Sequence, residues 1–196
     1  MMKEGQEKDY WTTRYKESKT GWDIGYPSTP LKEYIDQLTD KTLKILIPGA
    51  GNAYEAEYLY NQGFEHVYVL DISELPLQAF AARNPDFPKE QLVQANFFDI
   101  NDTFDLVVEQ TFFCALDPSL RPAYVKKMNQ LLKPEGKLVG LLFNFPLTDQ
   151  GPPYGGTLAR YQNYFSTDFD ILIMEPSYNS IESRAGLELF FMTRKK

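Results

Sequence analysis

The sequence predicts an α/β fold with a mostly parallel, seven-stranded sheet and helices on both faces. The first observation is an alternation of strand and helix patterns from residue 43 onward, which is typical of parallel sheets. The second is the glycine-rich turn Pro48-Gly49-Ala50-Gly51, which joins the first buried strand to the first helix of that alternation. The third is the pair of strand patterns at the end of the chain, which fits an antiparallel edge on a mixed sheet. With 43% hydrophobic residues among 196, the chain can build the core of one such domain.

Short apolar or β-branched runs are the expected strands. In chain order they are residues 44–48, 66–70, 91–95, 104–109, 137–143, 169–175 and 187–194. Helices are expected between them, at residues 52–61, 74–83, 120–132 and 157–165. Ser73 and Ser119 stand at two expected N-caps, because a serine hydroxyl can accept a hydrogen bond from the free N–H groups of the first turn. The strand at 137–143 is apolar along most of its length, so we expect it near the centre of the sheet.

Residues 1–40 do not fit this alternation, and we expect them to form an aromatic N-terminal arm on the domain at residues 41–196. The segment contains both tryptophans of the chain, Trp11 and Trp22, together with four tyrosines. It is too short for a separate domain and too aromatic for a disordered tail. The arm is therefore expected to pack on the domain or to close over it as a lid.

Composition excludes several classes of function. The formal net charge of −7 and the isoelectric point near 4.8 argue against nucleic acid as a partner, since such binding relies on Lys and Arg. No run of 18 apolar residues is present, which argues against a membrane span, and the polar first nine residues give no secretion signal. One cysteine, Cys114, and one histidine, His66, exclude Cys/His zinc sites and disulfide frameworks. We expect a cytoplasmic enzyme without a metal; the sequence leaves the oligomeric state open.

The glycine turn favours a nucleoside ligand without a phosphate. A P-loop would continue with Gly-Lys-Ser/Thr, but Asn52 follows Gly51, and Tyr54 stands where the dinucleotide fingerprint needs a third glycine. The second strand ends in Asp71, about 20 residues further on, where a carboxylate can accept both hydroxyls of a ribose. A ribose without phosphate points to S-adenosylmethionine. The alternative is that the turn only connects a strand to a helix.

Several motifs together resemble the thiopurine S-methyltransferase superfamily, and within it the thiol/halide methyltransferase branch of plants and bacteria. They are LIPGAGN, VYVLDIS, FDLVVEQTFFCALDPSLRPAYVKKMNQLLKPEGKL and GPPY, preceded by the aromatic segment YWTTRYKESKTGWDIGYPSTPL. The resemblance covers roughly residues 10–154. It implies a Rossmann-like class I methyltransferase fold, an S-adenosylmethionine cofactor, and a small soft nucleophile as methyl acceptor.

The resemblance also implies roles at the cofactor site. Gly49 and Gly51 would pass the methionine part of the cofactor, and Asp71 would bind its ribose. Asn96 and Phe97 would flank the adenine, although many relatives have an acid in place of Asn96.

Further residues are implied below and above the cofactor. Glu109 and Gln110 follow the fourth strand and would form the floor of the site. Trp11, Tyr15 and Trp22 would cover it, with Tyr15 standing where relatives often carry tryptophan.

At the acceptor side, the resemblance points to Arg121 and to Tyr154 as the residues that face the acceptor. Phe143 or Phe145 would complete an aromatic wall. The alternative for Arg121 is that it only forms an ion pair on the surface. Cys114 lies in the apolar run Phe112-Phe113-Cys114-Ala115-Leu116 and is expected to be a buried small hydrophobic residue.

The implied reaction is an in-line displacement, for which the protein must align the two reactants and remove water from an anionic acceptor. Aromatic walls suit both tasks, because they exclude water and their faces attract a sulfonium cation. Two alternatives stay open: a heterocyclic thiol or other small metabolite as acceptor, and a non-catalytic, cofactor-binding regulatory module.

Overall fold

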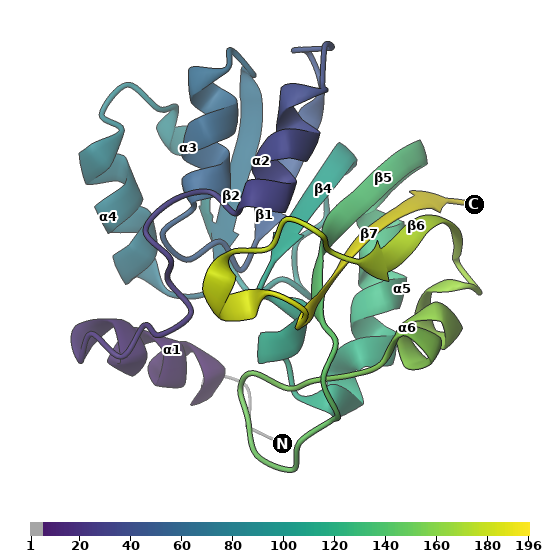
Figure 1. Cartoon of the computed structure of the whole chain (residues 1–196). Helices are drawn as coiled ribbons and strands as arrows, with labels where there is room; N and C mark the ends of the chain where they lie inside the picture. The colour runs from purple at the N-terminus through teal and green to yellow at the C-terminus, as the bar shows by residue number, and fades with distance from the viewer. Residues whose placement is uncertain (1–5) are drawn as a thin grey trace.

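One twisted sheet with helices on both faces forms the body of the molecule (Figure 1). The structure is a computed structural model that describes residues 6–196. Its strands are β1 Lys44–Pro48, β2 His66–Asp71, β3 Leu92–Gln94, β4 Phe104–Gln110, β5 Leu132–Phe143, β6 Phe169–Pro176 and β7 Glu188–Lys195. The strand order is β3-β2-β1-β4-β5-β7-β6, with the first five strands parallel and β7 antiparallel to both of its neighbours. The predicted fold class and the predicted antiparallel edge are both confirmed.

The helices occupy the positions between the strands. They are α1 Gln6–Lys16, α2 Thr29–Asp36, α3 Tyr54–Asn61, α4 Glu74–Arg83, α5 Arg121–Leu131 and α6 Leu158–Phe165. The helix predicted from residue 52 begins at Tyr54, because Ala53 adopts a left-handed conformation with φ 56°.

The region around α5 differs most from the prediction. Ser119 lies in a 3₁₀ turn, where the Asp117 side chain accepts a hydrogen bond from the Ser119 N–H at 2.9 Å, and α5 begins only at Arg121. Residues 133–136, which separate the predicted helix at 120–132 from the predicted strand at 137–143, belong to β5, and so does Leu132, which pairs with Phe104 before a register shift. A single irregular strand therefore extends from Leu132 to Phe143.

The core has two halves, one on each face of the sheet. Leu46, Val107 and Leu138 point to the face covered by α5 and α6. The next residues along two of these strands, Val108 and Val139, point to the opposite face, which α2, α3 and α4 cover. This alternation follows from the period of two in a β-strand.

The two helices of the expected arm behave differently. Leu31 and Ile35 of α2 are fully buried in the core, at 0% and 1% exposure. Helix α1 instead lies beside the start of α4, where Thr12 Oγ1 and Ser73 Oγ are 3.1 Å apart (Figure 1). The part of the expected arm that covers the domain from outside is therefore α1 together with residues 17–28. Residues 1–5 of the expected arm lie outside the described residues.

None of the helices within residues 6–196 combines the length and the apolar composition needed to cross a bilayer.

Candidate active site

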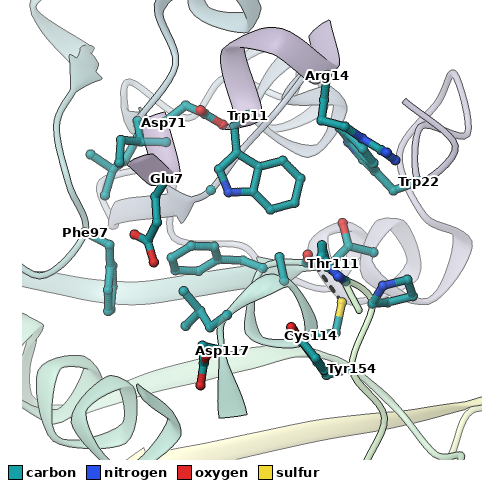
Figure 2. A pocket seen from close by; sticks show the side chains of 18 of the residues that line it. Glu7, Trp11, Arg14, Trp22, Asp71, Phe97, Thr111, Cys114, Asp117 and Tyr154 are labelled. Atoms are coloured by element: carbon teal, nitrogen blue, oxygen red, sulfur yellow. Dashed lines mark hydrogen bonds between the residues drawn. The ribbon is translucent and has the colours of Figure 1, made fainter. Parts of the chain in front are cut away.

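A cavity of about 560 Å³ lies at the carboxyl ends of the parallel strands (Figure 2). Gly49 follows β1, Asp71 ends β2, Asn96 follows β3, Thr111 follows β4 and Phe143 ends β5, and all of them line it. Open α/β sheets bind ligands at this edge, and the volume falls within the usual range for small-molecule sites.

The glycine turn passes between two aromatic side chains. Gly49 and Gly51 have φ values of 57° and 54°, in the left-handed region that favours glycine. A Cβ on Gly49 would lie 2.2 Å from the Phe112 ring, and one on Gly51 would lie 2.9 Å from the Tyr15 hydroxyl. The turn therefore has no room for side chains, which leaves its backbone at the cavity side accessible to a ligand.

Asp71 presents a buried, oriented carboxylate to the cavity. Its Oδ2 accepts a hydrogen bond from the Gly51 N–H at 2.9 Å, and its Oδ1 accepts one from the Ser73 N–H at 2.8 Å. Burial raises the pKa of this carboxyl to about 6, although the backbone hydrogen bonds oppose that shift. Since a carboxylate has about four lone-pair positions and the backbone N–H groups of Gly51, Ser73 and Ile72 lie against it, the carboxylate can still accept from a donor on a ligand.

Asn96 and Phe97 form the wall beyond Asp71. Phe97 is 4% exposed, and its ring packs edge-on against Phe112 with 5.2 Å between the ring centroids. Asn96 lines the cavity while its Oδ1 accepts a hydrogen bond from the Phe98 N–H at 3.0 Å. This end of the cavity can hold a flat aromatic group with a polar edge.

Glu109 lies behind the cavity wall and does not reach the cavity. It is completely buried, and its Oε1 accepts hydrogen bonds from the Phe112 N–H at 2.7 Å and the Phe113 N–H at 2.8 Å. Burial, with a contribution from nearby Glu188, raises its pKa to about 7. Glu109 thus influences the floor of the cavity indirectly, by holding the backbone of Phe112.

Gln110 lines a smaller neighbouring cavity of about 50 Å³.

The three aromatic residues expected in the arm do come together over the cavity. Trp22 packs edge-on against Trp11 and Tyr15, with ring centroids 5.4 and 5.7 Å apart. The Arg14 guanidinium lies 5.6 Å from the Trp22 ring. In Figure 2 Trp11 and Trp22 lie opposite Cys114 and Tyr154, on the far side of the cavity.

The two residues expected at the acceptor side lie at different depths. Tyr154 lines the cavity together with Pro152 and Pro153. Arg121 is 0% exposed and does not line it, because its guanidinium donates to the carbonyl oxygens of Tyr154 and Gly155. The expectation that Arg121 faces the acceptor directly is therefore corrected: the side chain lies behind the loop.

Arg184 is a cavity-lining cation that the sequence reasoning missed. It ends the 3₁₀ turn Glu182–Arg184 in the loop between β6 and β7, outside all of the predicted helices and strands. Its Nη2 donates to the Trp22 carbonyl oxygen at 2.7 Å, and its Nη1 lies 3.4 Å from Glu188 Oε1. The residue thereby connects the C-terminal strands to the arm. A lone arginine in a loop carries no sequence signal for such a role.

Cys114 is buried as predicted, at 6% exposure, but it also lines the cavity. Its Sγ lies 3.4 Å from the Thr111 carbonyl oxygen, the contact that is dashed in Figure 2. Burial and the proximity of Glu109 raise the pKa of the thiol far above its ordinary value. The side chain is therefore a neutral thiol in the wall near Tyr154.

Comparison with known proteins gives consistent results. The family model described as thiopurine S-methyltransferase matches residues 6–189. The chain is 30% identical over 184 residues to thiocyanate methyltransferase 1 of Brassica oleracea, covering 91% of this chain and 81% of that protein. It is 22% identical over 179 residues to thiopurine S-methyltransferase of Vibrio parahaemolyticus, covering 82% of each.

A solved structure shares the fold. The 1,6-didemethyltoxoflavin-N1-methyltransferase of Burkholderia thailandensis superimposes with a TM-score of 0.77 at 17% identity, over 96% of this chain and 87% of that one. That crystal structure contains S-adenosylhomocysteine.

Proposed function

Because the chain belongs to the thiopurine S-methyltransferase family and is an S-adenosylmethionine-dependent methyltransferase, we propose that its acceptor is a small soft nucleophile: a thiol, sulfide or halide anion. The observation that carries this proposal is the guanidinium of Arg184, which lines the cavity with its central carbon 5.7 Å from the centroid of the Phe143 ring. The Brassica oleracea relative, named for thiocyanate, supports the same class of acceptor. A cytoplasmic location and the absence of nucleic acid among the partners stay predictions.

The residues at the other end of the cavity fit S-adenosylmethionine. Gly49 leaves no space for a side chain where the methionine part would pass, and Asp71 has free lone pairs for ribose hydroxyls. Phe97 and Asn96 offer a ring face and a polar edge for the adenine. When bound, the cofactor supplies a methyl group on a positively charged sulfur.

We assign to the arm the role of a lid. Trp11, Tyr15 and Trp22 exclude water from the cavity, and their ring faces favour a cation beneath them. Gly51 and Gln110 belong to the neighbouring small cavity under the same arm, next to the methionine part.

The acceptor end has the properties needed to bind a soft anion. Arg184 attracts negative charge, but Glu188 neutralises part of that charge, so the site does not strip water from a strongly hydrated anion. The other walls are Phe143, the two prolines and Tyr154. Such a pocket favours polarisable anions that lose little on desolvation. The protonated Cys114 thiol in this wall does not compete with the acceptor, because the thiolate is the reactive form.

An acceptor screen tests the proposal. Calorimetric titration establishes cofactor binding, and S-adenosylhomocysteine release is then measured with hydrosulfide, thiocyanate, iodide, chloride, a heterocyclic thiol and a catechol. We expect the first three to react faster than chloride, and the catechol hydroxyl to react hardly at all. Equal rates with chloride and iodide, or preference for the catechol, would overturn the soft-nucleophile assignment; preference for the heterocyclic thiol would favour a thiopurine-like acceptor.

A further inference from the structure

We propose that Arg121 is a positioning residue, which acts on methyl transfer by fixing the acceptor loop, defined as residues 151–156. The inference rests on the proposed function in one respect, namely that Tyr154 of this loop forms a wall of the acceptor end. In this proposal Arg121 does not touch the acceptor; it holds the backbone of the acceptor loop in place.

The hydrogen bonds of Arg121 identify the loop as its partner. Its Nη1 donates to the Gly155 carbonyl oxygen at 3.0 Å, and its Nη2 donates to the Tyr154 carbonyl oxygen at 3.1 Å. Two parallel donors from one rigid guanidinium fix both the position and the direction of consecutive peptide groups.

The surroundings of Arg121 explain why the loop needs this partner. The side chain is completely buried, and within residues 6–196 no carboxylate forms an ion pair with it. Its charge is compensated by the two carbonyl dipoles and by the Phe113 ring, whose centroid is 4.7 Å from the guanidinium carbon. Since a buried charge without compensation is strongly unfavourable, moving the loop away would be opposed by the arginine itself.

The opposite side of the loop is held by backbone contacts. The Tyr154 N–H donates to the Cys114 carbonyl oxygen at 2.7 Å, and the Gly156 N–H donates to the Phe145 carbonyl oxygen at 2.8 Å. A Cβ on Gly155 would lie 2.3 Å from that same Phe145 oxygen, so the loop is packed as closely as its backbone permits. Without Arg121, these two backbone hydrogen bonds are what would hold the irregular loop among residues 6–196.

Arg184 provides the comparison that separates contact from positioning. Both arginines are buried near the acceptor end, but only Arg184 lines the cavity. Loss of Arg184 removes a charge from the cavity and leaves the bonds of the acceptor loop intact. Loss of Arg121 removes the bonds of the loop and no cavity charge.

The test compares Arg121→Met, Arg121→Lys and the control Arg184→Met by hydrogen exchange of the peptide over residues 151–156, with the cofactor-saturated protein. Acceptor kcat and KM with thiocyanate, and cofactor Kd by calorimetry, are measured on the same samples. For Arg121→Met we expect exchange of the hydrogen-bonded Tyr154 and Gly156 amides to increase about tenfold or more, acceptor kcat/KM to fall by about tenfold, and cofactor Kd to stay within about twofold. Arg121→Lys recovers little, because an ammonium is not a two-donor fork. Arg184→Met lowers acceptor kcat/KM with unchanged loop exchange.

Three results would overturn the proposal. The first is an Arg121→Met protein whose loop stays protected while acceptor activity is lost, and the second is an Arg121→Lys protein that keeps full acceptor activity; both indicate a role of the charge itself. The third is an Arg121→Met protein whose loop opens without a change in acceptor kinetics. If Arg121→Met does not fold, Gly155→Ala disturbs the same loop from its other side and must reproduce the kinetic pattern, with normal kinetics in this variant counting against the proposal. If no acceptor in the screen is methylated, the proposed function fails on its own, and the exchange comparison still decides whether Arg121 fixes the loop.

Discussion

The two ends of the cavity differ in how their residues are held. At the end that we assign to the cofactor, Gly49, Asp71 and Asn96 stand at or just beyond the ends of parallel strands, and backbone hydrogen bonds orient Asp71. At the acceptor end, Tyr154 and Arg184 come from two irregular segments, and long-range side-chain bonds connect these segments to the rest.

This difference separates two kinds of mutational effect. A residue at a strand end is placed by the sheet, so removing it should change ligand affinity, with structural effects confined to the adjacent turn, as for the Gly51 and Ser73 N–H groups beside Asp71. A residue on a loop is placed by other side chains, so its loss should spread to the segments that it holds. Changes at the first end should act on cofactor affinity, and changes at the second on acceptor turnover.

The largest effect is expected for Gly49→Ala. The added Cβ would meet the Phe112 ring at 2.2 Å while φ stays at 57°, so the turn must shift away from the ligand. We expect cofactor affinity to fall by more than about a hundredfold, since overpacking and left-handed strain together cost about 3 kcal/mol or more. Gly63→Ala is the control, because φ is 84° there but no atom lies within 4 Å of the added Cβ. Calorimetry should find normal affinity in the control; equal affinity in both variants would mean that the turn does not contact the cofactor.

Asp71→Ala should produce the next largest effect. Removing a charged acceptor of ribose hydrogen bonds costs about 1.5–3 kcal/mol, so cofactor Kd should rise about tenfold to a hundredfold while the fold survives. The exposed acid Asp99, mutated to Ala, is the control. Unchanged affinity in a folded Asp71→Ala protein would remove this residue from the site.

Arg184→Met tests the acceptor end of the cavity. Because Arg184 lines the cavity and donates to the Trp22 carbonyl oxygen, its loss should lower kcat/KM for thiocyanate by about tenfold, with a smaller effect on cofactor Kd. Arg184→Lys should recover part of the activity, since it keeps the charge. If cofactor affinity fell as strongly as acceptor kcat/KM, the division into two ends would be wrong at this residue.

The smallest effect is a pH dependence of cofactor affinity. Asp71 has a pKa near 6, raised by burial, and in the role that we propose its ionised form is the one that would accept hydrogen bonds from the ribose hydroxyls. Affinity should therefore be full above pH 6 and fall as the pH drops through it, by about fourfold at pH 5.5. Asp71→Asn should flatten the profile; a variant that kept the same dependence would point to another group.

The contribution of Asp71 to folding has the opposite sign. Its pKa is raised above the ordinary value of 3.8, so the folded chain binds the proton more tightly than the unfolded chain does. The stability associated with this carboxyl is present below pH 3.8 and is lost as the pH rises through about 6. Thermal unfolding of Asp71→Asn, compared with the parent between pH 4 and 7, measures this difference.

The sequence predicted the fold and the strand-end residues well, because both depend on local patterns. Strand runs can be located from apolar and β-branched residues, Gly49 belongs to a recognisable glycine turn, and Asp71 follows from its place at the end of the second strand; Asn96 was indicated by the family resemblance. The main error near the sheet concerned β5, because Leu132, predicted as the last residue of a helix, already pairs with Phe104 as part of the strand.

The acceptor end could not be predicted in the same way. Whether Arg121 points into the cavity or behind it depends on where the acceptor loop, 33 and 34 residues further on, places its carbonyl oxygens. Arg184 reaches the Trp22 carbonyl oxygen across 162 positions of the chain. Contacts of this kind come from tertiary packing, which has no periodic signature in a single sequence.

The position of the two tryptophans has an optical consequence. Trp11 and Trp22, the whole tryptophan content of the chain, stand over the cavity with ring planes 85° apart. Ultraviolet emission excited at tryptophan wavelengths therefore arises from the arm and from no part of the sheet. A change in the intensity or wavelength of this emission would report ligand entry into the cavity or movement of the arm, without an attached label. The folded state of the sheet would need a different signal, such as circular dichroism.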